Sequence, residues 1–423
     1  MDALWTPTVA WFTTTPLPAE VTARTRQLVL DTMACAIAGT RHEEVRRLGA
    51  VYSRTCPGEY AFPGQPSACA PSEAAALFTS AACWDEYCEG NEQARGRPGL
   101  HSVGLPVILG RSQGATVGDV LRAVALGYEV GARFGAALFT RQGFHVDGMW
   151  GTAAAAASAA AVMGLPAEQI VEAIGIAATT MSASQYLSVA HGATARNVYA
   201  ARGVSGGFVS ALSASAGITA PAGATSAAIE LLGRSDASAP LAAPGEFLLL
   251  DGYLKHWPGV RHAHYAVAAA LELRERLGGV PDDISLAVHP AAVEYAGVRA
   301  PESMLQAQFS CTYAVAYALL FGTLDVKAFE PQALSDPRLR ALEQRIDLTA
   351  GTRASGRYAR LSADGQEVFV DSIPGDPGRP ITEAQTRSKA LRLMTPQIGE
   401  AAAVELAEWV LGADLADPWR GMP

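Results

Sequence analysis

Apolar residues recur at helical spacing through most of the first 250 positions of the chain. This spacing predicts a helix over residues 21–38, which Gly39 ends. Alanine-rich faces on successive helices favour close packing, and glycines within the helical run at 203–207 allow still closer approach. We therefore expect one large all-α bundle. Its other helices are predicted at residues 72–84, 117–139 and from 166 onward.

The periodicity changes after residue 255. Residues 285–289 alternate between apolar and polar as a β-strand does, and residues 357–361 and 368–370 predict a hairpin around the turn Asp364-Gly365. These signals indicate a smaller α+β domain. Helical spacing separates its strands and returns towards the C-terminus, at residues 312–321, 337–346 and 382–411.

The predicted fold class is therefore mainly α, with a large all-α helical bundle domain and a smaller α+β domain. We expect the bundle to span residues 1–258 and to be rejoined by C-terminal helices in residues 386–423. The α+β domain is expected to span residues 259–385, which end near a proline- and glycine-rich connector at 374–380.

Composition narrows the classes of partner. Of the 423 residues, 49% are hydrophobic and only 17% are charged, so part of the surface is expected to be covered in a homo-oligomer. A net charge of −9 without a Lys/Arg cluster argues against a nucleic-acid partner. Residues 1–15 lack the features of a signal peptide, and polar residues break the apolar runs, so we expect no membrane segment.

Cysteine usage indicates the redox compartment and the absence of a metal site. The six cysteines form no CxxC pair and show no metal-ligand spacing. Several lie within helical apolar patterns, where cysteine usually serves as a small hydrophobic residue. We therefore expect a reducing, cytoplasmic setting, no disulfides and no zinc or iron–sulfur site.

The first candidate site is the loop 143–151. It places His145 and Asp147 among glycines, directly before an alanine-rich helix. Glycines let a backbone approach a ligand closely, and the N-terminus of a helix favours anions. A histidine adds a group that titrates near neutral pH. The loop is interpreted as a site for a small acid, although a tight turn with a structural histidine has the same sequence features.

Polar residues gather at four further places. Arginines in the glycine-rich stretch 89–101 suit carboxylate binding, although a solvated loop has the same composition. Lys255 begins a stretch with three histidines and an arginine, where a lysine with a lowered pKa serves as acid or base; structural histidines at a domain junction would explain the stretch equally. Arg196 is equally an ion-pair partner or a ligand contact. Ser310 and Cys311 precede Tyr313 on an apolar helix, as a cap and a candidate nucleophile that lacks an obvious base.

The order of these stretches resembles the MmgE/PrpD family, which includes 2-methylcitrate dehydratase and cis-aconitate decarboxylase. The resemblance implies a large helical domain, a smaller lid domain, a homodimer and a site between the domains. It also implies acid/base catalysis on di- or tricarboxylic acids, with no cofactor and no metal. Seven matching stretches run nearly end to end: residues 30–39, 89–101, 143–151, 165–178, 196–221, 255–264 and 309–320.

Site residues follow from this resemblance. His145, Lys255, Arg261 and His262 match residues of the family's active site, and Tyr313 falls near its tyrosine. One branch of the family also has a stretch that contains the equivalents of Asn91 and Arg95.

The chain departs from that branch at three positions. Cys88 stands where an aspartate is usual, Arg97 where a histidine is usual, and Ala195 where many members have a lysine. Arg97 thus adds a fixed positive charge, and His101 is a candidate for part of the lost acid/base role. These changes suggest a different substrate or reaction.

The leading hypothesis is a cofactor-independent lyase that dehydrates a β-hydroxy di- or tricarboxylic acid in a cleft between the domains. His145 is assigned as acid/base, with Lys255 as its partner or as the stabiliser of an enolate-like charge. Isomerases, epimerases and decarboxylases use a related first step, and a non-catalytic binding protein on the same scaffold is a hypothesis of a different class. The remaining roles are proton donation by Tyr313 and carboxylate binding by Asn91, Arg95, Arg97, Arg196, Arg261 and His262.

Overall fold

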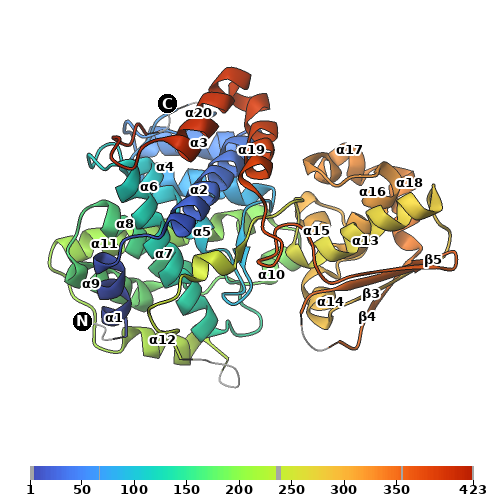
Figure 1. The fold of residues 1–423 in the computed structure, drawn as a ribbon, viewed down its shortest axis with the longest axis horizontal. Coiled ribbons are helices and arrows are strands. Elements are labelled where there is room, and N and C mark those ends of the chain that lie inside the picture. The colour runs from blue at the N-terminus through green and yellow to red at the C-terminus, as the bar shows by residue number, and fades with distance from the viewer. Residues whose placement is uncertain (1–3, 66, 235–239, 354–355, 422–423) are drawn as a thin grey trace.

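The computed structural model describes residues 4–65, 67–234, 240–353 and 356–421. Figure 1 shows a large bundle of helices beside a smaller unit in which helices cover a sheet. This arrangement confirms the predicted fold class, mainly α with a smaller α+β part.

The bundle is built from helices that are apolar on several faces. Its α-helices are α1 (Thr6–Thr14), α2 (Ala19–Gly39), α3 (Glu43–Thr55), α4 (Pro71–Trp84), α5 (Pro98–Ser102), α6 (Gly104–Leu109), α7 (Val117–Leu138), α8 (Gly151–Val162), α9 (Ala167–Thr180), α10 (Leu187–Ala190), α11 (Tyr199–Ser215) and α12 (Ala224–Leu232). Between them lie the 3₁₀ helices η1 (Thr194–Val198) and η2 (Leu248–Asp251) and the paired short strands β1 (Gly90–Asn91) and β2 (Gly252–Tyr253).

Small residues bring these helices close together. The alanines of α8 are buried, and α8 packs against α7 and α11. A methyl group added at Gly207 of α11 would lie 2.7 Å from the backbone nitrogen of Ala156, so only glycine fits there. Gly39 was expected to cap α2, but it is the last helical residue and faces the backbone of Ala81. The cap position belongs to Thr40.

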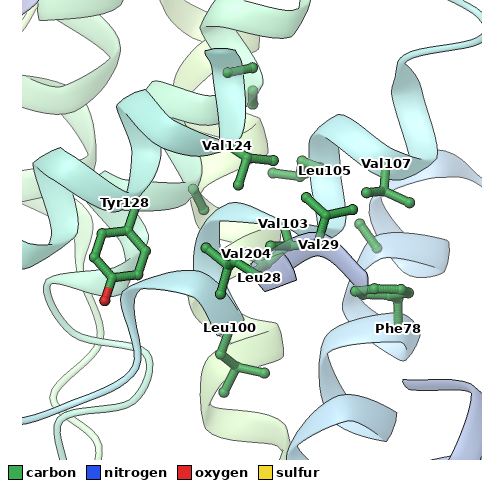
Figure 2. Close-up of a cluster of buried hydrophobic side chains, with 14 of the residues drawn as sticks. Leu28, Val29, Phe78, Leu100, Val103, Leu105, Val107, Val124, Tyr128 and Val204 are labelled. Atoms are coloured by element: carbon green, nitrogen blue, oxygen red, sulfur yellow. The ribbon is translucent and has the colours of Figure 1, made fainter. Parts of the chain in front are cut away.

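The core of the bundle is continuous from the first helices to the last. Figure 2 shows a part of it, in which side chains from α2, α4, α7 and α11 meet. The C-terminal helices α19 (Glu383–Ile398) and α20 (Glu400–Gly412) return to this core, and α19 packs against α2 (Figure 1).

The smaller unit contains a four-stranded sheet in the order β4-β3-β5-β6. β3 pairs with β4 in parallel and with β5 in antiparallel register, and helix α13 packs against β5 and β6. Its elements are α13 (Arg261–Leu277), β3 (Ile284–Val288), α14 (Pro290–Ala296), α15 (Met304–Gln308), α16 (Cys311–Phe321), η3 (Val326–Phe329), α17 (Pro331–Leu334), α18 (Pro337–Gln344), β4 (Ile346–Ala350), β5 (Ala359–Ala363) and β6 (Gln366–Val370).

The predicted hairpin is present. β5 and β6 pair in antiparallel register, and Asp364 and Gly365 connect them with positive φ angles of 49° and 74°. Positive φ at both positions is what a two-residue hairpin turn requires, and it explains the Asp-Gly sequence.

Two hydrophobic cores underlie the two units. The second core is built, apart from Val189, from residues between Val260 and Ile373, and the first from residues outside that range. We propose the domain division on this basis: residues 1–258 with 386–423, and residues 259–385. Within the described ranges no helix is both long enough and apolar enough to cross a membrane.

Candidate active site

Five buried ionisable side chains meet where the two cores adjoin. Each is at most 5% exposed, and they come from segments that lie far apart in the sequence. The smaller unit reaches this place through Gln308, whose amide donates to the carbonyl oxygen of Trp84, and through Phe309, whose ring lies 5.4 Å from the guanidinium of Arg196. The five are Glu86 after α4, Arg97 before α5, Asp147 before α8, Arg196 on η1 and Lys255 after β2.

Glu86 binds three cations at once. Its Oε2 atom accepts hydrogen bonds from Arg196 and from Nη1 of Arg97, the latter at 3.1 Å, while Oε1 lies 2.7 Å from Nζ of Lys255. Its backbone has a φ of 51°, a region that costs energy for a residue with a side chain and that often marks functional sites. Burial raises the pKa of Glu86, but the three cations overcome it and hold the pKa far below its usual value.

Asp147 is the second carboxylate of the cluster. Its Oδ2 atom accepts a hydrogen bond from Nη2 of Arg97 and lies 3.8 Å from Nη2 of Arg196. Burial again raises the pKa, and again the neighbouring cations, with Arg97 first, hold it far below its usual value. Both carboxylates are therefore ionised at neutral pH.

The cluster carries one positive charge in excess, because three cations meet two carboxylates. Burial lowers the pKa of Lys255, and Glu86 counteracts this effect. All three Lys255 donors are occupied, since Nζ also donates to the carbonyl oxygens of Glu86 and Gly259 at 2.8 and 3.0 Å. A buried cluster of this charge attracts a carboxylate. Among the described residues no three His, Cys, Asp or Glu side chains are grouped as metal ligands would be.

His145 lies beside this cluster on the loop that precedes α8. Its Nδ1 atom accepts a hydrogen bond from the N–H of Asp147 at 3.1 Å and lies 3.7 Å from Oδ2 of the same residue. Burial lowers the pKa of His145 to about 4, assisted by Arg196 and Arg97 and opposed by Asp147. The imidazole is therefore neutral at pH 7, as a proton acceptor must be.

The glycines of this loop set its shape. Gly148 has a φ of 82°, and a side chain there would collide with the backbone of Tyr199. The loop is also tied to a second segment, because the N–H of His145 donates to the carbonyl of Ser184 at 2.8 Å. Aromatic rings flank the imidazole, with Tyr199 at 5.7 Å and a stacked Tyr186 at 6.4 Å.

His101 supports the loop from behind. Its Nδ1 atom lies 2.9 Å from the carbonyl oxygen of Arg97, and its Nε2 atom accepts from the N–H of Gly148 at 3.1 Å. Both ring nitrogens are thus occupied, the side chain is fully buried, and burial lowers its pKa. The geometry supports a role for His101 in holding the loop rather than the acid/base role that was expected.

Arg261 and His262 stand on the side of the smaller unit, at the start of α13. Asp376 binds the guanidinium of Arg261 by an ion pair. His262 is half-buried, its ring stacks on Tyr295 at 5.8 Å, and burial lowers its pKa well below the usual value. Tyr295 in turn contacts Tyr186, so a row of rings links His262 to His145.

Three further expected site residues have contacts outside the cluster. Tyr313 is buried in the second core, where its hydroxyl donates to the carbonyl oxygen of Ala328 at 2.6 Å, so its expected role as a proton donor is not supported. The side-chain oxygen and nitrogen of Asn91 both bind backbone groups, which stabilises the loop. Arg95 is exposed and lies over the ring of Phe139, 3.6 Å from its centre.

Cys311 and Ser310 have structural surroundings. Cys311 is buried, and burial raises its pKa to about 12, which does not suit a nucleophile. Ser310 caps α16 by accepting from the N–H of Tyr313. The histidine-rich stretch 255–264 enters helix α13 at Arg261.

Two of the three departures from the family pattern, Cys88 and Arg97, contact each other. Nη1 of Arg97 lies 3.4 Å from Sγ of Cys88, so the usual aspartate and histidine are replaced together. Burial raises the pKa of Cys88 to about 12, which keeps the thiol neutral beside the guanidinium. Ala195 is exposed on η1, next to the buried Arg196.

The sequence does not single out Glu86 as a site residue, although it binds more members of the cluster than any other residue described above. Its only sequence signal is an acidic pair, Asp85-Glu86, directly after a helix that is apolar on all sides. Asp147 stands beside His145 in the sequence, but the pattern assigns it no role. Both residues act through partners that are distant in the sequence, so spacing alone does not reveal them.

Comparison with protein families covers most of the chain. The MmgE/PrpD N-terminal domain model matches residues 7–231, and the MmgE/PrpD C-terminal domain model matches residues 257–413. The chain belongs to the MmgE/PrpD family. Both matches together cover the bundle and the smaller unit of this MmgE/PrpD protein.

Individual relatives are more distant. A cis-aconitate decarboxylase of Aspergillus terreus is 30% identical over 208 residues, which are 44% of this chain and 41% of the relative. A cis-aconitate decarboxylase-like protein of Aspergillus oryzae is 28% identical over 207 residues, which are 43% of this chain and 42% of the relative. The MmgE/PrpD chain thus spans about two fifths of the length of the curated relatives it matches.

Proposed function

We propose that this MmgE/PrpD protein is a lyase that dehydrates a β-hydroxy di- or tricarboxylic acid with its own side chains as acid and base. The observation that carries the proposal is the buried cluster around Glu86 and Asp147, with one excess positive charge beside the neutral His145. The charge suits a carboxylate, and the neutral imidazole suits proton transfer.

In the proposed reaction the ring proton of His145 lies on Nδ1, towards the Asp147 carboxylate, in place of the hydrogen bond that Nδ1 accepts from the N–H of Asp147 in this structure. Nε2 then takes the proton α to a carboxylate and returns it to the departing hydroxyl group, which leaves as water. Asp147 stabilises the imidazolium that forms, because its carboxylate faces Nδ1. The cationic cluster, which includes Lys255, stabilises the enolate-like charge. Arg261 and His262 approach from the other domain and would hold a second carboxylate in the cleft between the domains.

Arg97 and Arg196 have two parts in this proposal. Each binds both carboxylates of the cluster, so each organises the site as well as contributing its charge. Asn91 and Arg95 are given no part in the reaction, because their contacts are with the loop itself and with Phe139. His101 holds the catalytic loop.

Decarboxylation is the second candidate. The names of the Aspergillus relatives favour it, since both are described as cis-aconitate decarboxylases or similar to them. Loss of carbon dioxide leaves a carbanion that needs the same stabilising charge and a proton donor, so the same cluster serves both reactions. Isomerisation and epimerisation would use the same base, and a non-catalytic protein would use the same charge to bind an acid.

The proposal includes a homodimer in a reducing, cytoplasmic setting. Exposed apolar side chains on and after α11 support an interface, because Val209, Leu212 and Ile218 are 58%, 43% and 56% exposed. The six cysteines carry free thiols, as a reducing compartment maintains them. Sedimentation equilibrium of the purified protein tests the dimer.

The test of function is proton NMR in D₂O with a panel of hydroxy di- and tricarboxylates and the matching unsaturated acids. Dehydration produces vinylic signals without carbon dioxide, whereas decarboxylation releases labelled carbon dioxide from a carboxyl-labelled acid. Exchange of the α proton alone indicates an isomerase or epimerase. His145→Ala is the matched variant, and we expect it to abolish turnover while the fold and the affinity for the acid remain.

Two results overturn the proposal. Full turnover by His145→Ala removes the assignment of the acid/base group. Binding of acids that raises the melting temperature without any turnover or exchange would make this MmgE/PrpD protein a binding protein.

A further inference from the structure

Lysine is rare in this chain, and its placement is unusual. The sequence contains only three lysines, Lys255, Lys327 and Lys389, although Lys and Arg together number 32. Lys327 is exposed, whereas Lys255 and Lys389 are 1% and 5% exposed. A buried ammonium group loses its hydration, so two buried lysines in one place call for a specific set of partners.

The two buried lysines are linked directly. Nζ of Lys389, on the C-terminal helix α19, donates to the backbone carbonyl oxygen of Lys255 at 3.0 Å. It also donates to the carbonyl oxygen of Tyr87 at 2.8 Å and lies 2.6 Å from Oδ1 of Asp31 on α2. The ring of Tyr87 lies beneath the ammonium group, with its centre 3.9 Å from Nζ.

These carbonyls belong to the two segments that build the site. Tyr87 directly follows Glu86, whose backbone holds a positive φ, and Lys255 is the residue that binds Glu86 from the other segment. Lys389 therefore connects the backbones of the two segments, whose side chains Glu86 and Lys255 form an ion pair with each other. If these two hydrogen bonds are lost, the segments can shift relative to each other, and with them the Glu86 and Lys255 side chains.

We propose that Lys389 and Asp31 are positioning residues, which fix the relative place of the two segments that carry Glu86 and Lys255. The inference rests on the proposed function for its kinetic readout. Asp31 keeps Lys389 charged: burial disfavours the charged lysine, but Asp31 and its neighbours raise the pKa of Lys389 above its usual value. Asp31 is 1% exposed, and Lys389, whose Nζ lies 2.6 Å from Oδ1, is the cation that pairs with it in the described part of the chain.

The same helix ties this place a second time. Arg392, one turn after Lys389, donates to the hydroxyl of Tyr87 at 2.9 Å, and that hydroxyl donates to the carbonyl of His256 at 2.7 Å. Helix α19 thus contacts both segments twice, once at the backbone of Tyr87 and Lys255 and once through the Tyr87 side chain. Helix α19, where the chain returns to the bundle, therefore supports the two segments that carry the site.

The test compares two variants that both lack the buried negative charge. Asp31→Asn keeps the two hydrogen bonds from Lys389 to the carbonyl oxygens, and Asp31→Asn/Lys389→Met removes them without leaving an unpaired charge in the core. Leu393→Ala is the control, because Leu393 lies on α19, is 6% exposed and packs in the bundle core, but has no polar atom that could bind the carbonyls. All three are measured well below their melting temperatures.

We expect the double variant to lower kcat and kcat/KM together, by about tenfold to a hundredfold relative to Asp31→Asn, because small displacements of reacting groups are costly. Leu393→Ala is expected to keep the wild-type kcat even if it melts earlier. Equal kcat in Asp31→Asn and the double variant, or an equal loss in Leu393→Ala, overturns the proposal.

Hydrogen–deuterium exchange provides a readout that needs no turnover. The double variant is expected to exchange faster than Asp31→Asn in peptides that cover residues 85–97 and 253–260, while Leu393→Ala changes exchange in α19 alone. If the wild type shows no lyase activity but this exchange pattern appears, the proposed function fails and the positioning tie stands. If neither segment changes its exchange, the positioning tie itself is wrong.

Discussion

Nδ1 of His145 accepts a hydrogen bond from the N–H of Asp147 at 3.1 Å and lies 3.7 Å from the carboxylate of the same residue. The backbone group binds the neutral ring, and the carboxylate faces the atom on which an added proton would be stabilised. Burial nevertheless dominates and lowers the pKa of His145 to about 4 from an ordinary 6.5. The folded protein therefore resists protonation of this ring while the unfolded chain does not.

This difference predicts how stability depends on pH. Between pH 6.5 and about 4 the unfolded chain protonates His145 and the folded protein does not, so the free energy of unfolding falls as the pH falls through this window. The contribution of His145 over the window is about 3 kcal/mol. Urea unfolding at several pH values measures it.

His145→Gln is the matched variant, because glutamine is polar and does not titrate. Other buried histidines, among them His101 and His264, have lowered pKa values and act in the same direction, so the wild-type curve alone is not diagnostic. The difference between wild type and variant isolates His145. A difference that stays constant from pH 4 to 6.5 contradicts the prediction.

Loss of the Arg97 guanidinium is expected to destabilise the cluster strongly. The guanidinium binds both Glu86 and Asp147, so Arg97→Gln leaves two buried carboxylates with fewer counter-charges. We expect the free energy of unfolding to fall by about 3–5 kcal/mol, the cost of breaking a buried ion pair from one side. Chemical denaturation of the variant measures this loss.

A double-mutant cycle provides the control. Asp147→Asn removes one of the two carboxylates that lose a counter-charge in Arg97→Gln, so the double variant Arg97→Gln/Asp147→Asn is expected to lose less than the sum of the single losses. Additive losses would mean that Arg97 and Asp147 are not coupled. The interpretation of Arg97 as an organiser of the cluster would then be wrong.

The sequence predicted the elements whose signals are local. The hairpin followed from Asp364-Gly365 between two alternating segments, and the close helix packing followed from glycines and alanines such as Gly207. It did not predict the ion-pair network, because Glu86 and Lys255 are 169 positions apart and no local pattern records that pairing. The tertiary fold alone brings them together.

Tyr313 shows why a single residue type misleads. A tyrosine on an apolar helix suits an active site and a core equally well, because a buried hydroxyl needs only one partner. In this chain the partner is the carbonyl oxygen of Ala328. His101 misled for a similar reason, since both of its nitrogens bind backbone groups that the sequence does not reveal.

Gly151 tests the supporting role of His101. Gly151 is the first residue of α8, and its Cα faces the imidazole of His101 so closely that a methyl group would overlap the ring. Gly151→Ala is therefore expected to displace His101 and to lower the free energy of unfolding by about 1–3 kcal/mol, as overpacking does. Loss of the anchor at Gly148 should also lower turnover.

The control for this prediction is a second substitution that makes room. In Gly151→Ala/His101→Ala the added methyl group has space, so the two changes are expected to cost less together than the sum of their single costs. Thermal melts of the four proteins decide between coupling and independence. A wild-type melting temperature in Gly151→Ala would show that His101 is not held where the structure places it.

Glu89 is expected to oppose His145 in the pH dependence of stability. Its side chain is buried, Oε1 accepts from the N–H of Leu100 at 3.1 Å, and no described residue donates a hydrogen bond to Oε2. Burial raises its pKa to about 8 from an ordinary 4.5, although the N–H of Leu100 and the charge of Arg97 oppose the shift. The folded protein thus favours the protonated acid.

The raised pKa of Glu89 determines the direction in which the free energy of unfolding changes with pH. The stabilising contribution of a raised pKa is complete below pH 4.5 and is lost as the pH rises towards 8, because the unfolded chain releases the proton first. The total loss is on the order of 5 kcal/mol. Glu89→Gln removes the titration, so its free energy of unfolding relative to wild type should increase steadily from pH 4.5 to 8.

The two variants are compared because their differences in free energy of unfolding from wild type should change with pH in opposite directions. Between pH 4.5 and 6.5, the wild-type advantage over His145→Gln should grow with pH, while the wild-type advantage over Glu89→Gln should shrink. A general pH effect on the fold would move both differences in the same direction. If the Glu89→Gln difference is flat to pH 8, the carboxyl group is ionised in the folded protein, and its environment is more polar than its buried position indicates.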